Sequence, residues 1–155
     1  MDKHKLFNLI DIYGRLNGLD DDEKALIMAM CIVESDLDEH AISSKKCKGL
    51  LQFADSTYKW MASQAGIQAK DMNVFDPEQH IMIGVRYFKY LRDVRDFKKH
   101  YPILIPMAWN WGEGNVKKYI GQDNLLDPAA VIYLPKETFK HVRAVYAEWL
   151  KIKRK

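Results

Sequence analysis

The sequence has few of the features that mark metal-binding, disulfide-rich or membrane-spanning proteins. Its 155 residues include only two cysteines, Cys31 and Cys47, which form neither a disulfide framework nor a zinc-binding spacing. The longest apolar run, 25–33, has nine residues, well short of the roughly 20 that cross a membrane. The histidines are scattered, and no phosphate-binding glycine motif occurs. We therefore expect no metal, organic cofactor or membrane span, and we interpret Cys31 as part of the core.

An export signal is also missing from the N-terminal residues. They are charged at first, but Asn8 and Asp11 interrupt the apolar segment that a signal peptide needs. The net charge of +3 is mild, and its excess gathers at 151–155. A basic tail can touch an anionic surface, but it also suits a solvated helix end beside the helix dipole. We prefer the second interpretation, and expect a protein made in the cytoplasm that binds no nucleic acid.

One domain spanning 1–155 is expected, and it is mainly α-helical. The length matches the commonest domain size, and no repeat, linker or long alternating strand pattern divides the chain. Apolar residues three and four apart predict an amphipathic helix over 3–17, which Gly18 ends. Capping-box spacing at Asp20 and Glu23 predicts a second helix, whose apolar run on every side indicates burial.

The remaining boundaries are expected at proline, glycine and capping residues. A break bracketed by Pro102 and Pro106 is expected before the helix that carries Trp109. The other expected features are a helix over about 55–66, a long helix from Asp76-Pro77 to about Phe97, a tight turn from Gly112 to Gly114, a helix from about 115, a turn at Pro128 and a helix over about 135–152.

Glu34 directly follows the buried apolar run and is the candidate catalytic residue. A general acid that breaks a glycosidic bond must still be protonated at the working pH, and burial favours the protonated form of a carboxyl. An exposed carboxylate on the last turn of a helix explains the same local pattern equally well. The neighbouring motifs therefore decide between these two interpretations.

Three segments occur in an order typical of one enzyme family. Glu34-Ser35, then GLLQ at 49–52, then AWNWG at 108–112 resemble the successive ES, GLMQ and AYNAG motifs of the soluble lytic transglycosylase catalytic domain. The resemblance covers nearly the whole chain and extends to Ala41-Ile42-Ser43, Asp76-Pro77-Glu78-Gln79, Gly84, Tyr87, Leu134-Pro135 and Glu137-Thr138. Each motif alone is weak, but several in sequence on the expected elements form a strong signal.

The resemblance implies a lysozyme-like helical fold that cuts the glycan strands of peptidoglycan. It implies that Glu34 acts alone, first as general acid toward the bond between N-acetylmuramic acid and N-acetylglucosamine, then as base toward the muramoyl 6-hydroxyl. The product is a 1,6-anhydromuramoyl end, formed without water. The substrate-binding residues that it implies are Ser35, which orients the acid, Leu51 and Gln52 at the sugar, Trp109, Asn110 at an N-acetyl group, and Glu137 lining the cleft.

A second catalytic carboxylate is not evident in the sequence. Most glycosidases use two, about 5 to 9.5 Å apart. Asp55 falls where a helix cap is expected, and three acidic residues follow Glu34 too closely to oppose it, namely Asp36, Asp38 and Glu39. A single acid, assisted by the substrate's own N-acetyl group, is therefore the preferred interpretation.

Two positions depart from the family pattern at aromatic residues. Trp109 stands where a tyrosine is usual; its indole offers one N–H donor and no acceptor, so it can stack on a sugar but cannot replace a phenol. His141 also stands where a tyrosine is usual, and we interpret it as a helix residue rather than a proton carrier.

The biological setting and the reaction each leave alternatives. A wall-cutting enzyme without an export signal is expected in a bacteriophage, as an endolysin or a virion component with virion partners, acting on peptidoglycan from the periplasm. A cellular enzyme whose leader was removed is the alternative. A hydrolase on the same fold, as in goose-type lysozymes, is the nearest rival activity. A non-catalytic wall-binding or virion structural module, indicated by Trp109, comes next, and a nucleic-acid-binding helical protein is the most distant.

Overall fold

Every regular element that the computed structural model describes is helical, and the description covers residues 1–121 and 134–154. The turn predicted at Pro128 lies outside these residues. In chain order the elements are α1 (Lys3–Leu16), α2 (Asp21–Ser35), α3 (Asp55–Gln64), η1 (Ala69–Asp71), α4 (Pro77–Lys89), η2 (Tyr90–Val94), η3 (Lys98–His100), α5 (Tyr101–Trp111), α6 (Glu113–Gly121) and α7 (Lys136–Lys153). This confirms the mainly α-helical fold class.

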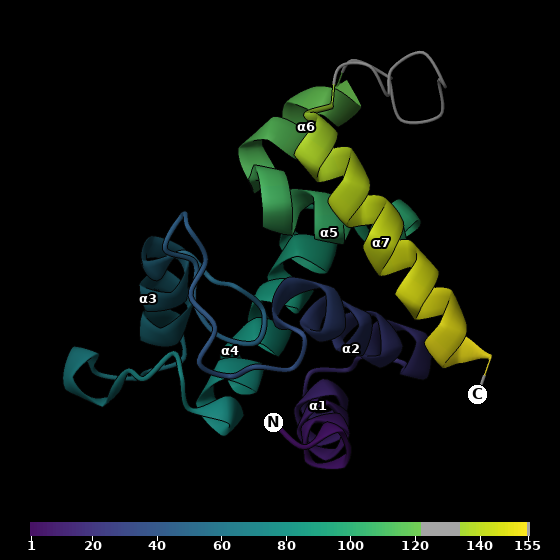
Figure 1. Cartoon of the computed structure of the whole chain (residues 1–155). Helices are drawn as coiled ribbons and strands as arrows, with labels where there is room; N and C mark the ends of the chain where they lie inside the picture. The colour runs from purple at the N-terminus through teal and green to yellow at the C-terminus, as the bar shows by residue number, and fades with distance from the viewer. Residues whose placement is uncertain (122–133, 155) are drawn as a thin grey trace.

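Helix α2 carries the most deeply buried stretch of the chain. All side chains from Leu26 to Cys31 are at most 2% exposed, and the helix packs against α1, α5 and α7 (Figure 1). The predicted capping box is present, because the Asp20 side chain accepts from the Glu23 backbone and the Glu23 side chain accepts from the Asp20 backbone. The burial also confirms that Cys31 belongs to the core.

Two further helix starts and ends follow the predicted signals. Helix α1 ends just before Gly18, which has a φ of +73°. Helix α4 begins after Asp76, whose side chain accepts from the backbone N–H of Gln79, with Pro77 as its first residue. The helix then continues as a single π-helical stretch, η2, and ends before the predicted Phe97.

The predicted break between Pro102 and Pro106 is wrong, since α5 begins at Tyr101 and runs through Pro106. Pro106 lacks the N–H that would bond to the Pro102 carbonyl. That carbonyl lies in the first helical turn. Pro106 therefore removes a single backbone hydrogen bond near the start of the helix. Burial of apolar side chains on both sides of the proline, each at most 3% exposed, favours the continuous helix: Leu104, Ile105, Met107 and Ala108.

The turn after α5 is narrower than the predicted Gly112 to Gly114 segment. Gly112 alone leaves the helical conformation, with a φ of +98°, and α6 already begins at Glu113. Gly114 is therefore part of a helix.

Residues 36–54 form an irregular segment between α2 and α3. It contains only isolated β-bridges, from Ile42 to Lys48 and from Lys48 to Phe53. In Figure 1 this loop and α3 stand to one side of α2, while α5, α6 and α7 stand to the other. Among the described helices, none is both long and apolar enough to cross a bilayer.

Candidate active site

Five of the predicted site residues line one hollow of about 170 Å³: Glu34, Gln52, Trp109, Asn110 and Glu137. A second hollow, of about 280 Å³, shares Cys47, Gln52, Trp109 and Asn110 with the first. The two adjoining hollows are called here the Glu34 cleft. The cleft therefore brings together residues from all three sequence motifs and from α7.

Glu34 lies in the last turn of α2, at the rim of the core. Its side chain is 13% exposed. The chain then turns away sharply, because Asp36 and Leu37 both take left-handed backbone conformations, with φ of +50° and +65°. This placement leaves the Glu34 carboxyl mostly buried while it still lines the hollow.

One face of α7 reaches three different parts of the Glu34 cleft. Residues at spacings of three and four share a helix face, and Glu137, Thr138 and His141 have this relationship. The Glu137 carboxylate lies 3.0 Å from Lys45 Nζ in the 36–54 loop. The Thr138 hydroxyl donates to Asn110 Oδ1 at 2.8 Å. His141 Nε2 lies 3.0 Å from Glu34 Oε1. Helix α7 thus contacts the loop, α5 and α2 at the site.

The glycine of the second motif allows a close backbone approach. Gly49 has a φ of +82°, and a Cβ there would lie 2.5 Å from His80 Cε1. The segment then turns so that Gln52, also at positive φ, enters the cleft. The Gln52 side-chain nitrogen donates to the carbonyls of Ala41 and Gly49 at 3.2 and 3.0 Å, which fixes the amide in the cleft wall.

A buried histidine supports the cleft from beneath. His80 Nε2 accepts a 2.8 Å hydrogen bond from the Leu51 backbone N–H, so Nδ1 carries the ring hydrogen and donates to the Val74 carbonyl, also at 2.8 Å. Burial lowers the pKa of His80 to about 4, which keeps the ring neutral. The Leu51 carbonyl in turn accepts from Trp109 Nε1 at 2.8 Å. This chain of hydrogen bonds links α4 to Trp109.

The structure does not bring Ser35 and Leu51 into the Glu34 cleft. The Ser35 hydroxyl donates to the Cys31 carbonyl of its own helix at 3.0 Å. The Leu51 side chain is fully buried and lies against Gly84 of α4. Ser35 therefore does not orient the acid here, and Leu51 supports the cleft rather than lining it.

His141, Lys45 and Cys47 lie at the cleft without having been predicted there. We predicted His141 to be an ordinary helix residue, whereas its ring lies against Glu34. The spacing of His141 from Glu137 and Thr138 is a signal that could have placed it on the same face. Lys45 and Cys47 lie in an irregular loop, where no periodicity indicates which side chains turn inward.

Three acidic side chains that follow Glu34 in the sequence are engaged elsewhere. Glu39 pairs with the Met1 amino group at 2.8 Å, and Asp38 accepts from the His40 backbone N–H. Asp55 is the first residue of α3 instead of its cap, and pairs with Lys48. Among the described acidic residues, the cleft hollows contain Glu34 and Glu137.

Burial keeps the Cys31 thiol in its protonated form. Burial, with a smaller contribution from the Glu34 charge, raises the pKa of Cys31 well above its usual value. Both cysteines are free thiols. Within residues 1–121 and 134–154, no three histidine, cysteine, aspartate or glutamate side chains gather as a metal site would require.

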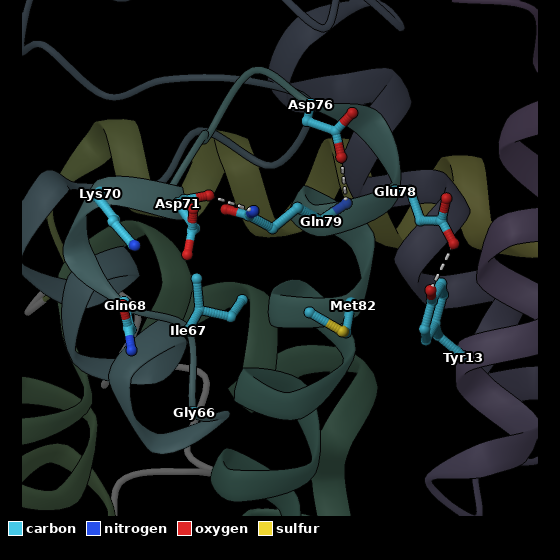
Figure 2. Close-up of a pocket in the computed structure, with 10 residues that line it drawn as sticks. All are labelled: Tyr13, Gly66, Ile67, Gln68, Lys70, Asp71, Asp76, Glu78, Gln79 and Met82. Carbon is cyan, nitrogen blue, oxygen red and sulfur yellow. Dashed lines mark hydrogen bonds between the residues drawn. The ribbon is translucent and has the colours of Figure 1, made fainter.

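A separate hollow of about 700 Å³ is lined by none of the predicted site residues (Figure 2). Two hydrogen bonds join residues that line it: the Tyr13 hydroxyl donates to the Glu78 carboxylate at 2.7 Å, and the Gln79 side-chain amide donates to the Asp71 backbone carbonyl at 3.0 Å. These bonds join α1 and η1 to the start of α4. The hollow is therefore a wide surface depression where these elements meet.

Comparison with known proteins gives the same family as the motifs. Over 93 residues, or 58% of the chain, the sequence is 32% identical to a membrane-bound lytic murein transglycosylase E of Buchnera aphidicola, of which it covers 42%. The fold is similar to that of the 70 kDa soluble lytic transglycosylase of Escherichia coli, with a TM-score of 0.79 and 23% identity. It is also similar to that of an inactive mutant of the lytic transglycosylase Slt of Pseudomonas aeruginosa, with a TM-score of 0.76 and 20% identity.

The chain spans less than half the length of these relatives. Each solved structure matches 95% of the chain, but the chain covers only 24% of either solved protein. The model of the family described as "Transglycosylase SLT domain" matches residues 18–132. Because this match includes well over half of the 155 residues, the chain belongs to the transglycosylase SLT domain family.

Proposed function

We propose that this domain is a peptidoglycan lytic transglycosylase in which Glu34 is the single catalytic carboxylate. The observation that carries the proposal is the position of Glu34, mostly buried in one hollow with Gln52, Trp109 and Asn110. The similar proteins are named lytic transglycosylases, which supports the same reaction here.

The reaction assigns two successive proton transfers to Glu34. The protonated carboxyl first gives its proton to the oxygen between N-acetylmuramic acid and N-acetylglucosamine, and the bond from that oxygen to muramoyl C1 breaks. The substrate's N-acetyl oxygen stabilises the positive charge at C1. The Glu34 carboxylate then takes the proton of the muramoyl 6-hydroxyl, and that oxygen bonds to C1. Glu34 ends protonated, and no water is consumed.

The cleft residues supply binding and orientation for these steps. Asn110 has its amide held by Thr138, which favours a fixed contact to an N-acetyl group. Gln52 is held by two backbone carbonyls and contacts the sugar. Fixed polar groups of this kind reduce the entropy lost when the substrate binds in its reactive geometry.

The second candidate is a hydrolase on the same fold, and Glu137 is the observation that favours it. Its carboxylate lines the same hollow as Glu34, and inverting glycosidases use a second carboxylate to activate water. Its pairing with Lys45 at 3.0 Å and the 64% exposure of its side chain argue for a cleft-lining role instead.

Mass spectrometry of digested peptidoglycan separates the two reactions. A transglycosylase releases 1,6-anhydromuropeptides, whereas a hydrolase releases products heavier by one water. Glu34→Gln is expected to lower the rate about a thousandfold, while Glu148→Gln, a control on α7 outside the cleft whose side chain is 28% exposed, keeps the wild-type rate. If wild type and Glu34→Gln clear purified cell walls equally slowly, catalysis at Glu34 is wrong and a non-catalytic wall-binding module is favoured.

A role in bacteriophage wall penetration or host lysis stays a prediction of the sequence. An endolysin made in the cytoplasm of a host cell is expected to lyse that cell only when a membrane pore is opened as well. A virion component is expected in purified phage particles.

A further inference from the structure

His141 and Glu34 form a close pair of mostly buried side chains. Their side chains are 9% and 13% exposed, and 3.0 Å separates His141 Nε2 from Glu34 Oε1. At this distance the ring nitrogen and the carboxyl oxygen are close enough to form a hydrogen bond. The contact therefore couples the imidazole to the carboxyl.

The pair lies within reach of a hydrogen bond but is not aligned for one. His141 Nε2 is buried, and its direction toward Glu34 does not meet hydrogen-bond geometry. Catalytic hydrogen bonds are often poorly aligned without substrate and tighten in the complex.

We propose that His141 is the positioning residue of Glu34, donating from Nε2 to Oε1 and so directing the second carboxyl oxygen at the scissile bond. The inference rests on the proposed function, because it assigns a partner to the acid of that reaction. Ser35, the residue expected to orient Glu34, is bonded to Cys31 in its own helix, so the orienting role falls to α7. The same carboxyl must donate and then accept a proton, and a fixed orientation serves both steps.

Two substitutions of similar size test the pairing. His141→Leu removes the donor, and is expected to lower kcat about 10- to 100-fold with KM within about twofold of wild type, since misplacement of a catalytic group slows the reaction without weakening binding. His141→Gln places an amide N–H near the position of Nε2 and is expected to restore most of kcat. Both parameters are measured on purified soluble glycan oligomers by chromatography of the products.

Three results would overturn the proposal: a wild-type kcat in His141→Leu, a raised KM with unchanged kcat, or a His141→Gln enzyme as slow as His141→Leu. Circular dichroism melts check that both variants fold. If His141→Leu does not fold, the test uses two other measurements. One is the comparison of wild type with His141→Gln, and the other is nitrogen-15 NMR of the imidazole ring. The Nε2 resonance of His141 is expected to move in Glu34→Gln and to stay in Glu148→Gln; no movement in Glu34→Gln would contradict the pairing.

Different results would contradict the proposed function and the positioning role of His141. An active Glu34→Gln enzyme would remove the proposed function. An inactive Glu34→Gln together with a fully active His141→Leu would leave the proposed function standing and remove the positioning role alone.

Discussion

The indole N–H of Trp109 donates a 2.8 Å hydrogen bond to the backbone carbonyl of Leu51, which joins the third sequence motif to the second. The only donor of the indole is thereby used inside the protein. Trp109 also contacts the rings of Phe53 and Tyr87, with centroids 5.2 and 4.8 Å apart. It therefore presents an apolar ring surface to the Glu34 cleft from a rigid position.

Replacing Trp109 with phenylalanine is expected to lower the free energy of unfolding by about 1 to 3 kcal/mol, because the Leu51 carbonyl loses its donor in a partly buried place. Trp60→Phe is the control, since Trp60 is 41% exposed, and it should cost less than about 1 kcal/mol. Chemical denaturation measures both. Equal losses in the two variants would contradict a structural role for the Trp109 N–H.

Because of His80, the free energy of unfolding is expected to fall below neutral pH. The pKa of its ring is lowered from 6.5 to about 4 by burial. Between these values the unfolded chain binds one proton more than the folded chain, so the free energy of unfolding rises with pH across this window and falls on acidification. The full contribution is at most about 3 kcal/mol.

Urea unfolding between about pH 4.5 and 7 tests this dependence. His80→Gln lacks the titrating ring, so it should be less stable than wild type at neutral pH but show a flatter pH dependence. The exposed His4 provides the control, because His4→Gln should keep the wild-type slope. A wild-type slope in His80→Gln would show that other groups cause the pH dependence.

Gly84 is expected to tolerate no side chain, because a Cβ there would collide with Leu51 Cδ1. Leu51 is fully buried, so Gly84→Ala should cost about 1 to 3 kcal/mol of unfolding free energy. Gly114 in α6 has no atom within 4 Å of an added Cβ, and Gly114→Ala should instead stabilise the protein by about 0.5 to 1 kcal/mol. In a Leu51→Val background the Gly84→Ala penalty should shrink; an unchanged penalty would place the collision elsewhere.

Local sequence signals predicted the helices because capping is a local interaction. The Asp20 and Glu23 box and the Asp76-Pro77 start both involve residues within one helical turn. The break predicted at Pro106 was wrong because the disruption caused by a proline depends on its distance from the start of the helix. Tertiary burial of α5 sets where that helix starts. The motifs indicated where the cleft lies, with Glu34, Gln52 and Asn110 in it.

Among the remaining site features, the direction of Ser35 follows from local helix geometry, whereas those of Leu51, Gln52 and His141 depend on the tertiary structure. Ser35 follows Glu34 by one residue and so points about 100° away around the helix. Leu51 and Gln52 are adjacent, but the backbone turns one into the core and the other into the cleft. The approach of His141 to Glu34 requires α7 to pack on α2, a contact between distant parts of the chain that no local spacing reveals.

The buried ion pair between Arg92 and Glu23 is expected to be the costliest single contact to break from one side. Arg92 Nη1 lies 2.8 Å from Glu23 Oε2, with side chains 11% and 7% exposed, and the other Glu23 oxygen serves the α2 capping box. Arg92→Met would leave the carboxylate buried without its cation, at a cost of about 3 to 5 kcal/mol.

Arg15→Met is the matched control, because the Arg15 side chain is 74% exposed and its ion pair should contribute less than about 1 kcal/mol. Denaturation of both variants and of Arg92→Met combined with Glu23→Gln completes the test. The double variant should regain part of the loss, since neutralising Glu23 removes the unpaired buried charge. If Arg92→Met costs no more than Arg15→Met, water reaches the Glu23 carboxylate and the pair contributes no more than a surface contact.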